Sequence, residues 1–544
     1  MTDETRNHNS YWKKFAGGGI LRMMLRTFTW RRGLTVLCLA SMCIVGRPTG
    51  AAPQETHDAR QLIVNAMRAM GGEEKLKAIK TTSWAVIGQR YMREQSERPA
   101  GPWLQDYFQS AVVRDLEHKR LREERQSRGC DSTECWKSAE WQAATLVFAD
   151  DAAAQKSQGK FSPTRGEAAR NSKDWIVLDP IRLLISAQAA KDLREEPAME
   201  FYGFRQSVVA FTYDGAPVRL ILNPGTGLPS GAEITRTALD NFFWGPWGDI
   251  TTRVSWTFWE LERGGVRYPR QWDAESNGRP NWTLTINEWT INPETKEETF
   301  AIPAETAAAI RRRKLSIEEL PLGTVNAPAK EVAPGIVQVP GSWNVEEVEF
   351  DDGIAILEGP ISSGYSARAI ADAEKRFAGK KVKMVVTTSD AWPHLGGMRE
   401  YAARGIEIYA LDLNKPILEQ LFAAPHQMKP DELQRHPRKP VWHMVSGPTV
   451  AGGRENRMEI IPLRTQTGER QMVVYFPLAK LLYTSDLFQK DGQGNYFLPQ
   501  TMSEAVDVVK REKLDVEAVF GMHLAKTDWK EVVAAVEKQV GGSN

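Results

Sequence analysis

The sequence has little of several features that mark specialised classes of protein. Its 70 basic and 69 acidic residues nearly cancel, and no long stretch carries one sign, so no nucleic-acid partner is expected. No apolar run reaches the ~20 residues of a membrane-spanning helix, so no integral membrane span is expected in the mature chain. With 544 residues, the chain exceeds what one hydrophobic core usually serves. We therefore expect two globular domains.

The start of the chain has the order of a secretory signal peptide. Three arginines precede an apolar run at residues 34–45, and small residues follow at 49–51. We expect residues 1–51 to be a signal peptide with an N-terminal extension or an internal start near Met23, and the mature protein to be periplasmic or secreted. A retained N-terminal anchor is the alternative.

Cysteine is scarce. Two of the four cysteines lie in the expected signal peptide, which leaves Cys130 and Cys135 in a polar segment. In an oxidising compartment these two are expected to form a local disulfide. A redox pair or half of a zinc knuckle is the alternative, but redox pairs favour two intervening residues, and no second Cys or His pair lies nearby.

After the signal, the pattern predicts a helix followed by antiparallel strands, an α+β arrangement. Apolar residues recur every three or four positions over residues 58–70, and Gly71-Gly72 ends the helix. Strand-like runs then alternate with turns, as at 208–222 around Asp214-Gly215. We expect a curved antiparallel β-sheet with one buried face.

This order, together with the turn Asn223-Pro-Gly-Thr-Gly-Leu-Pro229 and the closing Phe300-x-x-Pro303, resembles periplasmic lipoprotein-carrier-like domains over residues 52–320. The resemblance implies a half-barrel with helices that holds acyl chains, and hence a small-molecule or lipid-like ligand. Seven tryptophans between Trp244 and Trp289 could line its groove. Packing in the core explains these aromatic residues at least as well.

A second domain is expected after a short linker. Residues 321–333 lack periodicity and are rich in turn formers, which predicts a linker. From 334 to 544, short β-rich runs come to alternate with helical stretches such as 366–377, which predicts an α/β domain.

The strand expected at residues 382–388 leads into a recognisable motif. The segment Thr387-Thr-Ser-Asp-Ala-Trp-Pro-His-Leu-Gly-Gly397 resembles the first metal motif of the metallo-β-lactamase superfamily, Thr-His-x-His-x-Asp-His-x-Gly-Gly. The ligand positions of that motif fall on Ser389, Ala391, Pro393 and His394. Only the last histidine of the motif is therefore retained.

Later motifs of the family are also identified. Leu481–Phe488 matches the stretch that ends in the family's bridging aspartate, here Asp486, and Phe520-Gly-Met-His523 matches its final histidine. The histidine expected within 461–477 is missing. The resemblance covers about residues 334–530 and implies an αββα metallo-β-lactamase-like sandwich.

In active members of that family, two zinc ions polarise a carbonyl or phosphoryl group and supply the nucleophile. Here the site built from three histidines is lost, and His394, Asp486 and His523 remain, a set that could hold one zinc or iron ion. The resemblance gives Asp486 a second, catalytic role as a base. The remaining candidates are Arg464 as an anion contact, Asp390 and Ser389 as substrate-binding residues, and His426, His436 and His443 as extra ligands.

Two functions follow from this ligand set. The first is an exported metallo-β-lactamase-superfamily hydrolase-like protein with a reduced, mononuclear metal site and an unknown substrate. The alternative is a catalytically inactive pseudo-hydrolase without a metal, which acts as a ligand-binding or scaffolding module of the cell envelope. In that alternative, the retained side chains hydrogen-bond one another and hold the loops together. Fold alone does not decide between them.

Overall fold

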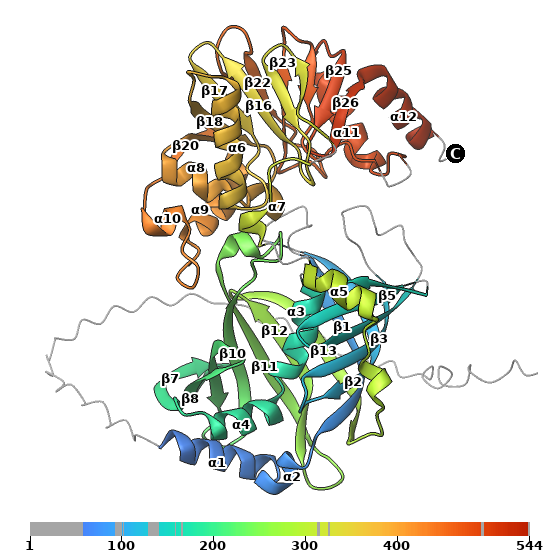
Figure 1. Ribbon diagram of the computed structural model, residues 1–544, viewed down its shortest axis with the longest axis vertical. Coiled ribbons are helices and arrows are strands. Elements are labelled where there is room, and N and C mark those ends of the chain that lie inside the picture. The colour runs from blue at the N-terminus through green and yellow to red at the C-terminus, as the bar shows by residue number, and fades with distance from the viewer. Residues whose placement is uncertain are drawn as a thin grey trace, which may run out of the picture. The chain divides into compact units, whose positions relative to one another are not determined.

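The computed structural model describes residues 58–92, 101, 103–128, 141–157, 159–164, 167–312, 316–324, 327–490 and 494–541. The expected signal peptide, Cys130 and Cys135 lie outside these ranges, so the predictions made for them stay predictions. All described residues belong to one compact unit, Thr56–Asn544. We refer to residues 58–312 as the N-terminal region and to 316–541 as the C-terminal region (Figure 1). Within the described ranges, no helix is long and apolar enough to cross a bilayer.

The first helix, α1 (Ala59–Met70), has the bounds that the apolar spacing predicts. The Asp58 carboxylate accepts a hydrogen bond from the backbone N–H of Arg60, which satisfies one of the free donors at the helix start. The helix ends at Gly71, whose φ of 128° is costly for any residue with a side chain.

Thirteen strands of the N-terminal region form one antiparallel sheet in the order β6-β5-β4-β3-β2-β1-β13-β12-β11-β10-β9-β8-β7. The strands are β1 (Thr81–Met92), β2 (Leu104–Asp115), β3 (Arg120–Arg128), β4 (Gln142–Ala149), β5 (Ala152–Ser157), β6 (Lys160–Pro163), β7 (Arg194–Phe201), β8 (Phe204–Tyr213), β9 (Ala216–Leu222), β10 (Pro229–Thr237), β11 (Asp249–Leu261), β12 (Arg267–Ser276) and β13 (Arg279–Ile291). Asp214 and Gly215 join β8 to β9 with φ of 53° and 71°, as a two-residue hairpin requires.

Helices α3 (Glu167–Val177) and α4 (Pro180–Ala189) pack on the apolar face of this sheet. Trp175 of α3 lies about 6 Å, between ring centroids, from each of three aromatic rings on the central strands, Trp84, Phe108 and Trp282. Trp256, Trp272 and Trp282 are at most 2% exposed. These tryptophans therefore fill the core. The remaining helices of the region are α2 (Glu73–Lys77), α5 (Ala304–Arg312) and the 3₁₀ turns η3 (Gly245–Trp247) and η4 (Glu297–Phe300).

The C-terminal region has two sheets. The first has seven strands in the order β14-β15-β16-β17-β18-β19-β20, parallel from β17 onward, and the second has six in the order β21 to β26. The strands are β14 (Lys330–Ala333), β15 (Ile336–Val339), β16 (Val345–Phe350), β17 (Gly353–Leu357), β18 (Val382–Thr387), β19 (Glu407–Leu411), β20 (Val441–Val445), β21 (Thr449–Ala451), β22 (Met458–Pro462), β23 (Met472–Phe476), β24 (Leu481–Tyr483), β25 (Ala518–Gly521) and β26 (Leu524–Asp528).

Helices cover the outer faces of both sheets. Side chains of α6, α8 and α9 pack on the first sheet, side chains of α11 and α12 pack on the second, and a third apolar cluster lies between the sheets. The helices are α6 (Ser363–Arg376), α7 (Trp392–Leu395), α8 (Met398–Arg404), α9 (Lys415–Ala423), α10 (Glu432–Arg435), α11 (Pro499–Arg511), α12 (Trp529–Gly541) and the 3₁₀ turns η5 (Ile317–Glu319) and η6 (Asp412–Asn414).

The end of the expected linker is a strand. Residues 330–333 form β14 and pair with β15, because Val332 belongs to the apolar cluster between the two sheets and is 6% exposed. The segment 321–333 is rich in turn-forming residues, so its composition predicts a linker and does not reveal that Val332 is buried.

Candidate metal centre

His394 is presented by the short helix α7, which follows β18. Pro393 stands in the first turn of α7, where its missing N–H costs nothing. The Gly-Gly pair after α7 allows a close approach, because a Cβ on Gly396 would clash with the Ile361 carbonyl and one on Gly397 would clash with Ser366. The glycines of the motif therefore seat α7 against the start of α6.

Asp486 and His523 come from two neighbouring turns of the second sheet. Asp486 follows β24, and His523 lies between β25 and β26. The two turns are joined by backbone hydrogen bonds from Thr484 N–H to the Phe520 carbonyl (2.9 Å) and from Met522 N–H to the Ser485 carbonyl (3.1 Å). These bonds fix the spacing between the two side chains.

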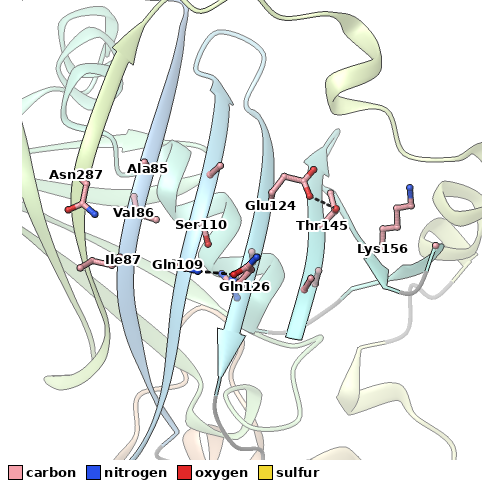
Figure 2. Close-up of a pocket in the computed structure, with 15 residues that line it drawn as sticks. Ala85, Val86, Ile87, Gln109, Ser110, Glu124, Gln126, Thr145, Lys156 and Asn287 are labelled. Carbon is pink, nitrogen blue, oxygen red and sulfur yellow. Dashed lines mark hydrogen bonds between the residues drawn. The ribbon is translucent and has the colours of Figure 1, made fainter. Parts of the chain in front are cut away.

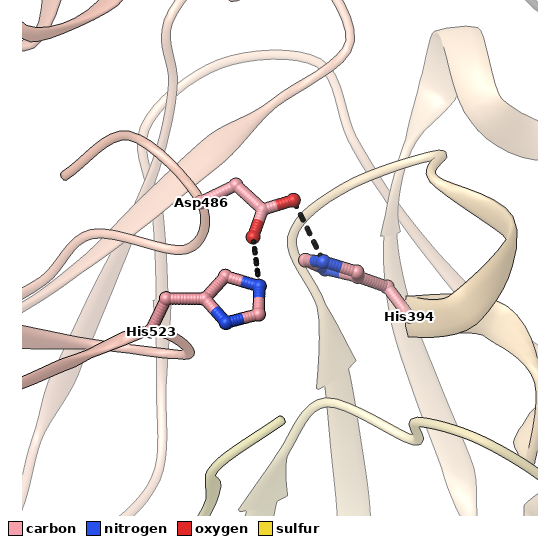
Figure 3. Close-up of side chains that lie close together, drawn as sticks. All are labelled: His394, Asp486 and His523. Atoms are coloured by element: carbon pink, nitrogen blue, oxygen red, sulfur yellow. Dashed lines mark ion pairs between the residues drawn. The ribbon is translucent and has the colours of Figure 1, made fainter. Parts of the chain in front are cut away.

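The three side chains that the sequence motifs predicted as ligands converge (Figure 3). Nε2 of His394 lies 2.7 Å from Oδ2 of Asp486, and Nε2 of His523 lies 3.0 Å from Oδ1 of the same carboxylate. All three ligand atoms lie within 4.8 Å of one another, and among the described residues this is the one group of three or more ligands that could hold a metal ion. The His394 side chain is 1% exposed, against 18% for Asp486 and 26% for His523.

Within the triad, each charged side chain stabilises the charged form of its neighbours. Burial by itself would raise the pKa of Asp486, but His394 and His523 outweigh it and hold that pKa far below its usual range. Burial would likewise lower the pKa of His394, but the carboxylates of Asp486 and Glu358 more than offset it and raise the pKa. The cluster therefore favours an ionised aspartate between two imidazoles.

The donor set fits a single divalent cation. Two imidazole nitrogens and a carboxylate are ligands that zinc and iron accept, and tetrahedral ligands at about 2.0–2.2 Å from zinc lie roughly 3.3 Å apart. Oδ1 of Asp486 is buried without a hydrogen-bond partner, because His523 lies near it but is not aligned to donate. Its lone pairs therefore remain available to an ion.

Glu358, which the motif comparison missed, lies behind His394. It follows β17 with a φ of 72° and is 0% exposed, and Oε2 lies 3.9 Å from the otherwise unpartnered Nδ1 of His394. Thr388 donates to it through its backbone N–H (3.2 Å) and its hydroxyl, and Tyr483 donates at 3.3 Å. Burial raises its pKa to about 7. A carboxylate directly after the apolar run 353–357 and before Gly-Pro was the available signal.

The structure gives the three further candidates different roles. The Ser389 hydroxyl accepts from the Ala391 N–H (3.1 Å) and so is used by the turn before α7. Burial raises the pKa of Asp390 to about 7, and the charges of His394 and Asp486 also act on this carboxyl group. Arg464 donates to Asp412 at 2.6 Å, so its charge is compensated by that carboxylate.

The three extra histidines lie elsewhere. His426 is near the Pro246 carbonyl (3.2 Å), His436 is near Glu432 (3.5 Å), and His443 is near Glu407 (3.1 Å) and stacks on Tyr409. None of the three joins the triad.

A pocket of about 640 Å³ lies on the N-terminal sheet, on the face opposite α3 and α4 (Figure 2). Its polar side chains largely satisfy one another, since Gln109 and Gln126 are 2.8 Å apart and Thr145 donates to Glu124 at 2.6 Å. Its lining has no histidine and no cysteine, and its hydroxyl-to-carboxylate contact, between Thr145 and Glu124, is exposed.

No protein-family model matches the chain, and no curated protein matches it. Among solved structures it is similar in part to the stereoselective inverting sec-alkylsulfatase Pisa1 from Pseudomonas sp., with 16% identity over 39% of this chain and 41% of that chain and a TM-score of 0.29. The chain thus spans about two fifths of the alkylsulfatase.

Two metallo-β-lactamases overlap over almost their whole length. DIM-1 is 13% identical over 40% of this chain and 97% of its own, with a TM-score of 0.31. FIM-1 from Pseudomonas aeruginosa, in its mono-zinc form, is 13% identical over 41% and 98%, also with a TM-score of 0.31. TM-scores this low carry no argument about the fold of the chain.

Proposed function

We propose that the chain is an exported envelope protein whose C-terminal region is a metallo-β-lactamase-like, αββα hydrolase domain with a reduced, mononuclear metal site. The observation that carries the proposal is the convergence of His394, on α7, with Asp486 and His523, on two turns of the second sheet. The layering of helices, sheet, sheet and helices in that region supports the fold assignment.

In this proposal His394 and His523 bind the ion through Nε2 and Asp486 binds it through its carboxylate. When bound, zinc or iron would supply a Lewis acid that polarises a carbonyl or phosphoryl group and activates water. The Glu358 carboxyl group, 3.9 Å from Nδ1 of His394, would favour a proton on that nitrogen and so leave the Nε2 lone pair for the ion. Asp390 is the nearby carboxyl group suited to accept a proton near neutral pH.

The N-terminal region is proposed to be a lipoprotein-carrier-like module. Support comes from the order of helix, antiparallel strands and the Asn223–Pro229 turn. Because α3 and α4 occupy the apolar face of the sheet, an acyl chain would bind there only if these helices moved.

The alternative function is a metal-free pseudo-hydrolase that binds a ligand or a partner protein. The 2.7 Å contact between Nε2 of His394 and Oδ2 of Asp486 favours it, because that ion pair joins the two side chains without a cation. It is also roughly 0.6 Å shorter than the spacing of two zinc ligands, so metal binding requires the pair to open slightly.

Metal content separates the two functions. The protein from Ala52 onward, without a His tag, is loaded with zinc or iron, dialysed against chelator-free buffer and measured by plasma mass spectrometry. We expect about one equivalent, and its loss in Asp486→Asn and His523→Gln. The matched control is His443→Gln, which removes a histidine outside the triad. A folded, metal-free wild type would support the pseudo-hydrolase, and metal retained in both triad variants would mean that the ion is not bound by the triad.

A further inference from the structure

A pocket of about 220 Å³ lies beside the first turns of α4, and we call it the α4 pocket. Its apolar walls are Ile79, which precedes β1, Leu116, which follows β2, and Ile181 and Ile185, which lie one turn apart on α4. Ile79, Leu116 and Ile181 are at most 5% exposed, and Ile185 is partly buried. The Leu116 N–H donates to the Lys80 carbonyl (2.9 Å), which holds the two strand ends together. The aliphatic walls of the pocket are therefore in place before any ligand binds.

Basic side chains outnumber acidic ones around this pocket. Its lining includes Lys77, Lys80 and Arg182 and, among the described residues, a single acid, Glu117. Nζ of Lys80 lies 2.7 Å from the Glu117 carboxylate. Nζ of Lys77 lies 2.6 Å from the carboxylate of Glu73 on α2, and these four side chains are 47–55% exposed. The two lysines are therefore compensated by neighbouring glutamates, and the surplus positive charge belongs to Arg182.

Arg182 forms no ion pair with any described carboxylate. Its Nε donates to the hydroxyl of Tyr213 (3.2 Å), which holds the guanidinium in place. The two NH₂ groups of Arg182 have no hydrogen-bond partner in the described part of the chain, and neither is buried. They are therefore free to donate to one carboxylate, whose two oxygens match the planar fork of a guanidinium.

We propose that the α4 pocket binds an aliphatic carboxylate of medium chain length. The carboxylate would accept hydrogen bonds from the two NH₂ groups of Arg182, and the single surplus charge suits a monoanion. The chain would pack against the side chains of Ile79, Ile181 and Ile185, where each buried methylene adds to the affinity. At about 220 Å³ the pocket lies below the ~300 Å³ at which drug-sized ligand sites begin, which suits a chain of roughly six to eight carbons.

This ligand differs from the acyl groups that a lipoprotein carrier would hold. Those groups are linked as esters and amides without charge, so they would leave Arg182 unpaired, whereas a free carboxylate supplies the missing anion. The pocket is also present with α3 and α4 packed on the sheet, so binding requires no movement of these helices. The site therefore depends neither on the proposed carrier-like module nor on the proposed metal centre.

The test uses octanoate as the probe and octanamide as its neutral match, with affinities from ligand-observed NMR on the protein from Ala52 onward. We expect the wild type to bind octanoate more tightly than octanamide. Hexanoate, which is two methylenes shorter, should bind about 15-fold more weakly, since each buried methylene contributes about fourfold. Dodecanoate should gain little over octanoate, because a pocket of this size does not bury the longer chain.

Two variants test the head and the tail of the ligand separately. Arg182→Met should weaken octanoate binding about tenfold and leave octanamide within about twofold. Ile185→Trp, which fills the pocket from α4, should weaken the binding of both ligands about tenfold. Arg267→Met, on β12, is the matched control and should change neither affinity.

Circular dichroism checks that each variant folds. Arg182→Lys keeps the charge but not the planar fork, so its octanoate affinity should lie between those of wild type and Arg182→Met. The proposal is overturned if octanoate shows no saturable binding at millimolar concentration, if octanamide binds as well as octanoate, or if Ile185→Trp leaves octanoate binding unchanged. It is equally overturned if affinity keeps rising about fourfold per methylene up to dodecanoate, or if Arg267→Met weakens binding as much as Arg182→Met.

Discussion

The two regions bury charged side chains in opposite ways. In the N-terminal core, Arg114 and Asp179 form a 2.9 Å ion pair with both side chains 0% exposed. Arg114 also donates to the Trp175 carbonyl (2.7 Å) and to the Thr82 hydroxyl (2.8 Å), and Tyr268 donates to Asp179 (2.6 Å). One cation meets one anion, and the neighbouring polar groups satisfy the two NH₂ groups of Arg114, while its Nε has no hydrogen-bond partner among the described residues.

The C-terminal cluster is open and rich in acids. Asp486 and His523 reach solvent, and the carboxyl groups of Glu358 and Asp390 lie close enough to act on the charge of His394. A balanced, closed network is what a structural role requires. In the C-terminal cluster the carboxylates outnumber the imidazoles, so some negative charge is not compensated within the cluster. A bound cation would compensate it. From this comparison we expect the first network to contribute mainly to stability, and we propose that the second binds a cation.

The largest effect is expected from breaking the closed network with Arg114→Met. The variant leaves Asp179 buried without its cation, and breaking a buried pair in this way costs about 3–5 kcal/mol. Asp179 also caps α4 through the N–H of Ile181 (2.9 Å), so the damage should spread to that helix. Urea unfolding followed by circular dichroism measures the loss, while metal uptake by the remaining folded protein should not change.

The matched control is Arg267→Met, because Arg267 is exposed and donates only to the Ala69 carbonyl (3.0 Å). Its free energy of unfolding should change by about 0.5 kcal/mol or less. If Arg114→Met lowered the free energy of unfolding no more than this control, the network around Arg114 and Asp179 would not be important for stability.

A smaller and pH-dependent effect is expected from Glu346→Gln. Glu346 points between the two sheets, is 0% exposed, and accepts from Gln338 at 3.1 Å. Burial raises the pKa of Glu346 well above its usual value. The folded protein therefore binds a proton that the unfolded chain releases near pH 4.5. This contribution to stability is fully present below that pH and is lost as pH rises toward the folded pKa.

Glutamine carries no such proton, so Glu346→Gln should gain stability relative to wild type as pH rises from 5 to 8. The gain should be at most about 1.4 kcal/mol per pH unit. Thermal unfolding at several pH values measures it, with Glu349→Gln on the same strand as control, since Glu349 lies at the surface and pairs with Lys380 (2.9 Å). Parallel pH profiles for wild type and Glu346→Gln would mean that Glu346 is ionised in the core.

The elements of the fold were predictable where a local pattern determines them. The apolar spacing of 58–70 predicts α1, and Asp214-Gly215 predicts the β8–β9 hairpin, because both depend on neighbouring residues alone. The strand β14 was hidden, since a single buried valine in a turn-rich segment decides it. Sheet order and the fit of α3 and α4 against the sheet depend on contacts far apart in sequence, so no local pattern shows them.

The candidate site was predictable only where the family motifs keep their residues. His394, Asp486 and His523 were identified in this way, and they converge. Arg464 lay at a motif position but pairs with Asp412, a partner 52 residues away in sequence that no spacing rule reveals. Glu358 was missed because its importance comes from burial behind His394, which is a property of the folded chain.

The smallest effect is expected from a pair of neighbouring glutamates on β3. Glu123 faces the core, where it is 1% exposed and accepts from Arg125 (2.7 Å) and Ser110 (2.6 Å). Glu124 faces the pocket of Figure 2 and accepts from Thr145.

Glu124→Gln should change the free energy of unfolding by about 0.5 kcal/mol or less, because water replaces the interactions that an exposed carboxylate loses. Glu123→Gln should cost several times more, because it leaves Arg125 buried without its anion. Urea unfolding of the two variants measures both free energies of unfolding and so compares the two costs. Equal costs would show that the two faces of the sheet are equally closed to water, and the contrast between closed and open charge clusters would then fail within the N-terminal region itself.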